Sequence, residues 1–155
     1  MLNELLQVVF VTLLPYLELR GGIPLGVWVL HLDPLLVFTV SVLTNVLLVI
    51  PTFIILRFVF PFVEKVKLFQ KALEKLRSKG NKVIEKYGFW GLMIFVAIPA
   101  PGTGAYSGSI LAFILNMNKW KAFAAVVLGV LIAGIIVSII VAGAWQGFQF
   151  FLARV

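Results

Sequence analysis

The sequence predicts an all-α polytopic membrane protein with two inverted repeats, each made of a re-entrant helical hairpin and a transmembrane helix. The composition gives the class, because 62% of the 155 residues are hydrophobic and only 12% are charged, against about 25% charged in soluble domains. Long apolar runs alternate with short ones, and their order recurs about 84 residues later in the chain. We expect one membrane domain, with repeat one at 1–60, a linker at 61–87 and repeat two at 88–155.

The first half opens with an apolar run at 5–17, which is too short to cross ~30 Å of hydrocarbon. The run ends in a polar, glycine-containing break at 18–22. A helix over 22–32 would cover only about half a membrane. Asp33 and Pro34 are typical of an N-cap and a first helical residue, and residues 35–60 after them are long enough to span.

The linker at 61–87 is the strongly polar part of the chain, with eight Lys or Arg residues and three acids. Its apolar residues recur at helical spacing, which predicts an amphipathic helix lying on the bilayer. The positive-inside rule places this helix in the cytoplasm. A basic helix can also bind nucleic acid or a calmodulin-type partner. In so apolar a chain, anionic lipid headgroups are the expected partner and nucleic acid is not.

The second half repeats this order, with a short apolar run at 88–98, a break at 99–108, another short run at 109–115 and a span at 120–147. Asn118 lies in the turn that would cap the span. One hairpin plus one span per half gives an odd number of crossings, so the two repeats would be inverted. This arrangement puts both termini outside. The alternative treats 2–31 and 88–115 as kinked spans and gives four transmembrane helices.

The break at 99–108 contains two prolines and three glycines, which cannot continue a regular helix. Irregular backbone at membrane depth is tolerated only where it is buried in protein or lines a watery cavity. The break therefore predicts the floor of a binding site. An ordinary turn at the membrane surface is the alternative.

Glu18 is the one acid inside an apolar stretch, and an ionisable group at membrane depth is a functional candidate by default. We expect Glu18 to carry a coupled proton and Arg20, two residues away, to contact an anion. The alternative is that the two side chains neutralise each other and pin the loop. For Asn45 we expect a bond across helices or a substrate contact, and Arg57 is expected to snorkel to the interface.

Helix N-termini near Gly22 and Gly104 would point free N–H groups at the centre of the molecule, where hydroxyl side chains add further donors. Such a site suits a phosphate or a carboxylate. The candidate binding residues come from both breaks: Glu18, Arg20, Gly22, Pro24, Pro99, Pro101, Gly102, Thr103, Gly104, Tyr106 and Ser107, with the hydroxyl of Ser109 nearby. With no cysteine and a single histidine, we expect no metal site, no cofactor and no enzyme activity.

The two motifs, ELRGGIPLG from Glu18 and PAPGTGAYSG from Pro99, resemble the small multi-drug export family of prokaryotic membrane proteins. More distantly, the chain is similar to the DedA/VTT superfamily. That resemblance implies paired re-entrant hairpins and, for DedA-like members, proton-coupled movement of phosphate-headed lipids. Glu18, Arg20 and Pro24 match its first loop, and Pro99 and Gly102 match its second. The chain departs from that pattern in one respect, because the arginine of the second loop is absent.

We therefore expect a multi-pass transporter of the prokaryotic cell membrane that moves an anionic amphiphile, such as a phosphate-bearing lipid, together with protons. A small multidrug-type antiporter, in which Glu18 alternately binds a proton and a lipophilic cation, is the alternative. Because a chain of this size can hardly enclose a pathway by itself, we expect a homodimer.

Overall fold

The computed structural model describes residues 1–63, 87–100 and 102–152, and all of the regular secondary structure in these residues is helical. The elements in chain order are α1 (Leu2–Leu13), α2 (Glu18–Pro24), the π-helical η1 (Leu25–Val29), α3 (Pro34–Val63), an unlabelled helix (Tyr87–Ala97), α5 (Ala105–Ile114) and α6 (Lys119–Leu152). Of the linker helix predicted at 61–87, residues 64–86 lie outside the described residues, as does Pro101, while residues 61–63 belong to α3 and Tyr87 belongs to the next helix.

Two helices in the described part of the chain are long and apolar enough to cross a membrane, over Pro34–Phe62 in α3 and Lys119–Ala144 in α6. They confirm the two long segments predicted at 35–60 and 120–147. Large apolar side chains on both helices point outward, and Leu47 and Ile139 are 64% and 67% exposed. An apolar surface of this kind is typical of helices that face lipid, so the chain is an all-helical membrane protein.

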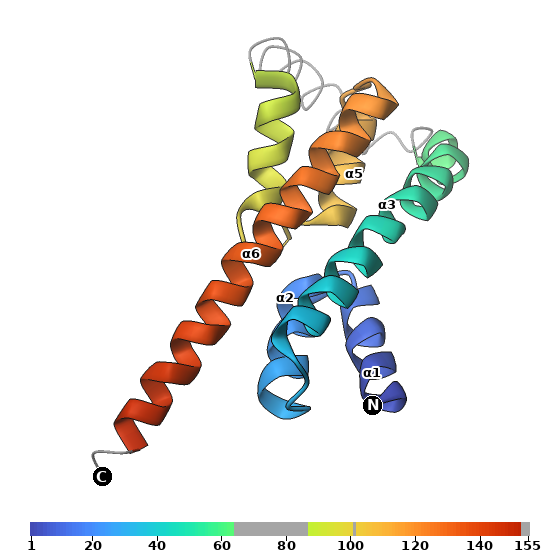
Figure 1. Ribbon diagram of the computed structural model, residues 1–155. Coiled ribbons are helices and arrows are strands. Elements are labelled where there is room, and N and C mark those ends of the chain that lie inside the picture. Colours follow the sequence, from blue (N-terminus) through green and yellow to red (C-terminus); the bar gives the residue numbers. More distant parts are fainter. Residues whose placement is uncertain (64–86, 101, 153–155) are drawn as a thin grey trace.

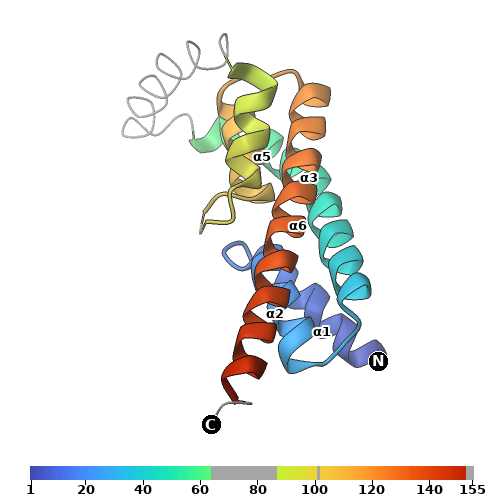
Figure 2. The same ribbon diagram turned by 60° about the vertical axis from the view of Figure 1, so that its left-hand side comes forward.

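Two helical hairpins enter the molecule from opposite ends, and their turns face each other halfway along α3 and α6 (Figure 1). One hairpin consists of α1 and α2 with η1, and the other of the Tyr87–Ala97 helix and α5. Both α2 and α5 contact both α3 and α6, and the turned view in Figure 2 shows the same interleaving. The start of α1 and the far end of α6 lie at one end of the molecule, whereas the end of α3 and the start of the Tyr87–Ala97 helix lie at the other.

The two halves share the positions of their elements. In each half, a hairpin of short helices precedes a long helix, and the long helix begins at Pro34 or, 85 residues later, at Lys119. Each long helix is capped as predicted. Asp33 Oδ1 accepts the Leu36 N–H at 2.9 Å, and Asn118 Oδ1 accepts the Trp120 N–H at 3.0 Å. The residues that close the preceding helices, His31 and Asn116, both adopt a left-handed conformation with φ of 51°.

Both breaks differ from the prediction, because several of the glycines lie inside helices. The first turn lies at 14–17, before the predicted 18–22, so Gly22 is helical, and the second ends at Gly104, so Gly108 is helical. A Cβ built on Gly22 would lie 2.1 Å from Thr12 Oγ1. A Cβ on Gly108 would lie 2.4 Å from Val96 Cγ2. These glycines allow two helices of one hairpin to approach closely, rather than freeing the backbone from the helix.

Candidate functional site

Glu18 joins the two hairpins at the centre of the molecule. It is the first residue of α2 and adopts a left-handed conformation with φ of 48°. Its side chain is 3% exposed, and its two carboxylate oxygens accept the N–H groups of Ala105 at 3.2 Å and Tyr106 at 3.3 Å. These N–H groups open α5, where the helix dipole is positive. Glu18 therefore caps a helix that lies 87 residues further along the chain.

Gly104 leaves the space that this contact requires. A Cβ built on Gly104 would lie 1.8 Å from Glu18 Oε2, so any other residue would displace the carboxylate. The Gly104 N–H itself donates to Ser107 Oγ at 2.9 Å. The prediction of free N–H groups near Gly104 is therefore wrong, since the carboxylate of Glu18 and the hydroxyl of Ser107 occupy them. It is also wrong for Gly22, which lies inside α2 instead of at its start.

Arg20 binds the turn of the opposite hairpin. Its Nη2 donates to the carbonyl oxygens of Ile98, at 2.9 Å, and Thr103, and it contacts Thr103 Oγ1 at 3.1 Å. Ile98 directly follows the Tyr87–Ala97 helix, so its carbonyl lies at the negative end of that helix dipole. Thr103 Oγ1 also lies 2.6 Å from the Ile98 carbonyl oxygen, to which it can donate. The cation thus meets a helix C-terminus while the nearby acid meets a helix N-terminus.

Glu18 and Arg20 do not form an ion pair with each other. Within the described part of the chain, the salt bridge that forms joins the N-terminal amine to Glu4. Each of the two charges is instead hydrogen-bonded to the backbone of the opposite hairpin. The two residues do pin a loop, as one prediction had it, but not by neutralising each other.

Tyr106 adds a further link between the hairpins, because its hydroxyl donates to the carbonyl oxygen of Leu13, the last residue of α1, at 2.8 Å. The structure thus gathers Glu18, Arg20, Thr103, Gly104 and Tyr106 into one contact network. Three other predicted residues lie beside it: Ser107 in α5, and Pro99 and Gly102 in the turn. Pro24 lies at the far end of α2.

Several polar side chains near this network are buried without a hydrogen-bond partner among the described residues. Both the Oδ1 and Nδ2 atoms of Asn45 lack one, although the residue is 0% exposed. The buried hydroxyls of Ser41 and Ser109 also lack a hydrogen-bond partner among the described residues, as does Nε of Arg20. Buried polar atoms are nearly always paired in proteins, with protein groups or with water. The prediction that Asn45 bonds across helices therefore has no counterpart in the structure.

The register of α2 against α3 places Asn45 at the level of Glu18. A Cβ on Gly26 would lie 2.6 Å from Val37, and one on Gly22 would lie 3.1 Å from Ser41 Oγ. Because α2 and α3 run in opposite directions, continuing this register by one turn in each helix pairs the level of Asn45 with that of Glu18. Ser109 lies one turn into α5 from Ala105. Sequence reasoning missed Ser41, although its spacing of four from Asn45 on an apolar helix is a readable signal.

Comparison with known proteins identifies the family. Residues 18–136 match the model of the family described as "Putative small multi-drug export protein". This stretch is more than half of the chain and contains the whole contact network, so the chain belongs to that family. The description is that of an export protein, a transporter rather than an enzyme. No curated protein and no solved structure matches the chain. The more distant resemblance to the DedA/VTT superfamily stays a prediction.

Proposed function

We propose that this member of the small multi-drug export family is a proton-coupled transporter of an anionic amphiphile, such as a lipid with a phosphate headgroup. The observation that carries the proposal is the position of the Glu18 carboxylate on the first two N–H groups of α5. A helix N-terminus is a ready-made site for phosphate or carboxylate. In this protein, a tethered carboxylate already occupies that site.

Protonation of Glu18 couples binding of the proton to binding of the anionic substrate. A neutral carboxyl group is held less strongly by the positive end of a helix than a carboxylate is. The proton therefore releases the N–H groups of Ala105 and Tyr106, and the headgroup of the substrate takes the place of Glu18. When the headgroup leaves, Glu18 gives up its proton and returns to α5. The proton and the anion thus travel in the same direction.

The two hairpins give this site access to both sides of the membrane. The twelve residues of α1 extend about 18 Å, well short of ~30 Å of hydrocarbon. We take both hairpins to be re-entrant and the two halves to be inverted repeats, with the turns meeting near the midplane. Four plain spans would put both ends of the linker at the same end of the molecule as the start of α1. The end of α3 and the start of the Tyr87–Ala97 helix lie opposite the start of α1 in Figure 1, which supports the re-entrant arrangement. The termini are then outside and the linker is cytoplasmic.

The unpaired polar atoms of Asn45, Ser41 and Ser109 support a site that holds more than protein. An amide and two hydroxyls can hydrogen-bond a headgroup or the water that accompanies it. The register of α2 against α3 places Asn45 at the level of Glu18, where the headgroup would bind. The eight cations of the linker would hold anionic lipids at the cytoplasmic surface, and a homodimer would help to enclose the pathway.

The family description names multi-drug export, and a second candidate function of that kind is exchange of a lipophilic cation for a proton on Glu18. In that mechanism the carboxylate binds the cation directly. Two backbone donors already engage the Glu18 carboxylate, however, and the cationic Arg20 lies two residues away. Both features favour an anion at this site.

Transport by the purified chain in proteoliposomes tests the proposal. We expect a fluorescent alkyl phosphate to accumulate under an imposed proton gradient, and tetraphenylphosphonium not to exchange. Glu18→Gln should abolish the accumulation, because glutamine keeps the size of the side chain but cannot exchange a proton. Glu4→Gln, at the exposed start of α1, is the matched control and should transport normally. Wild-type rates for Glu18→Gln would remove Glu18 from the mechanism, and saturable exchange of the cation alone would establish the antiporter.

A further inference from the structure

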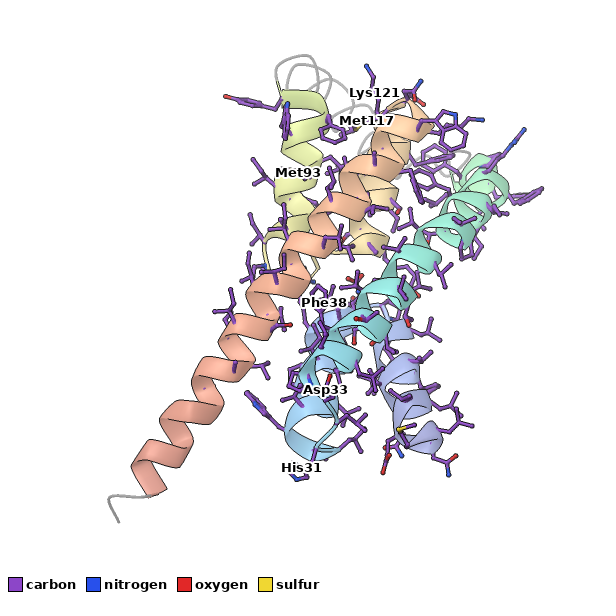
Figure 3. All side chains as sticks on the ribbon, in the orientation of Figure 1. His31, Asp33, Phe38, Met93, Met117 and Lys121 are labelled. Atoms are coloured by element: carbon purple, nitrogen blue, oxygen red, sulfur yellow. The ribbon has the colours of Figure 1, made fainter. Side chains whose placement is uncertain are left out.

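A groove lies between α3, the end of α5 and the start of α6, far from the network around Glu18. Its volume is about 400 Å³, within the ~300–1,000 Å³ range of small-molecule sites. The apolar part of its lining consists of Phe53, Ile54, Phe113 and Met117. Phe113 is held in place by an edge-to-face contact with Phe60, whose ring centroid lies 5.0 Å away. Figure 3 labels Met117 and Lys121 at this end of the molecule.

The polar part of the lining is cationic. Arg57 from α3 and Lys119 from α6 both line the groove, together with Asn116, and no acid is among the described residues that line it. Among the described residues, the acids lie elsewhere. Asp33 is labelled at the opposite end in Figure 3, and Glu4 lies near the start of α1, which is at that end too. Two positive charges from different helices thus line one apolar groove, and the described part of its lining contains no residue that neutralises them.

The depth of these two cations matches the headgroup layer of a bilayer. Arg57 lies near the end of the 30-residue α3, and Lys119 is the first residue of α6. Both therefore lie where a spanning helix leaves the hydrocarbon, at the end that faces the linker. A single Lys or Arg at such a position is ordinary snorkelling. The convergence of two cations over an aromatic groove needs a different explanation.

We propose that this groove is a binding site for an anionic phospholipid of the leaflet that faces the linker. The phosphate would lie between Arg57 and Lys119, and an acyl chain would lie along Phe53 and Phe113. The apolar floor favours a lipid over free phosphate or a soluble phosphate ester. The site involves neither Glu18 nor the hairpin turns, so the lipid site can be tested independently of the proposed transport.

Native mass spectrometry of the full chain in detergent tests the proposal, with phosphatidylglycerol and phosphatidylcholine offered at equal concentration. The wild type should retain phosphatidylglycerol in preference. The double variant Arg57→Gln with Lys119→Gln should lose affinity by roughly fivefold for each cation removed. Lys121→Gln is the matched control, because Lys121 is an exposed cation of the same helix end that does not line the groove. It should retain the lipid.

Thermal melting of each variant shows whether it is folded, so that loss of lipid is not confused with loss of structure. A wild type that retains the two lipids equally would overturn the proposal. An equal loss in the double variant and in Lys121→Gln would also overturn it, because binding would then depend on overall charge. Displacement of the lipid by glycerol phosphate at similar concentration would show that the groove recognises a soluble anion.

Discussion

At the scale of single residues, the helix ends decide where the two central charges bind. Glu18 and Arg20 are two residues apart, and the alternative drawn from the sequence is that they neutralise each other. Instead the acid binds the N-terminus of α5 and the base binds the carbonyl that follows the Tyr87–Ala97 helix. The carboxylate meets the positive end of one helix dipole and the guanidinium meets the negative end of another, so both contacts are favourable. Together they fasten the turn of each hairpin to the other.

Gly104→Ala tests how closely Glu18 approaches α5. The added Cβ would lie 1.8 Å from Oε2 and would force the carboxylate off the two N–H groups. We expect a loss of about 2–4 kcal/mol of stability, because the variant leaves charged and polar groups unpaired. Gly143→Ala is the control, since a Cβ there meets nothing within 4 Å. Melting in detergent compares the two variants, and equal midpoints would contradict the contact.

Asn45→Leu separates a structural role from a functional one. Asn45 has no hydrogen-bond partner among the described residues, so the change removes two unpaired buried polar atoms. Replacing such atoms with apolar ones is close to neutral or stabilising. We expect an unchanged or higher melting temperature together with reduced transport. A marked loss of stability would show that the side chain has a partner inside the protein.

At the scale of elements, the sequence correctly predicts the features that depend on residues close together in the chain, such as the starts of the long helices. Asp33 and Asn118 mark the starts of α3 and α6 correctly, because an N-cap depends on residues within one turn. The breaks are predicted at the wrong residues because Gly22 and Gly108 make room for side chains of the neighbouring helix, which the local sequence pattern does not reveal. The contact between Glu18 and α5 joins residues 87 positions apart. Sequence alone selects the residues of this site, but it cannot show that they bind each other.

The packing of α2 and η1 on α3 depends on Gly26. A Cβ on Gly26 would lie 2.6 Å and 2.7 Å from the two Cγ atoms of Val37. Gly26→Ala should therefore cost about 1–3 kcal/mol through overpacking. Val37→Ala removes both Cγ atoms, so the double variant should be more stable than the sum of the single effects. A double-mutant cycle measured by melting in detergent checks this, and strict additivity would contradict the contact.

At the scale of the whole molecule, charge and topology agree. Of the described cations, Arg57, Lys119 and Lys121 lie at the end where the linker joins, and that linker contributes further positive charge. Asp33 and the start of α1 lie at the other end. In the proposed topology, the positive-inside rule orients the linker end toward the cytoplasm, and the two hairpins lie between α3 and α6 at the depth of the membrane.

Cysteine labelling tests this topology, and the absence of native cysteine makes the background clean. Asn3→Cys should react with an impermeant thiol reagent added to intact cells, and Ser78→Cys in the linker should react only after the membrane is opened. The reason is that a re-entrant first hairpin returns the chain to the side from which it entered. Labelling of both positions from the same side would support four plain spans instead.

The central claim is that the Glu18 carboxylate and the anionic headgroup compete for the first N–H groups of α5. By linkage, an anion that binds only when Glu18 is neutral must draw a proton from solution. The most direct measurement is proton uptake, followed with a pH indicator, when an alkyl phosphate is added to the purified protein. We predict uptake by the wild type, affinity that strengthens as the pH falls, and neither effect in Glu18→Gln. Binding of the phosphate without proton uptake, or equal uptake in Glu18→Gln, would contradict the account.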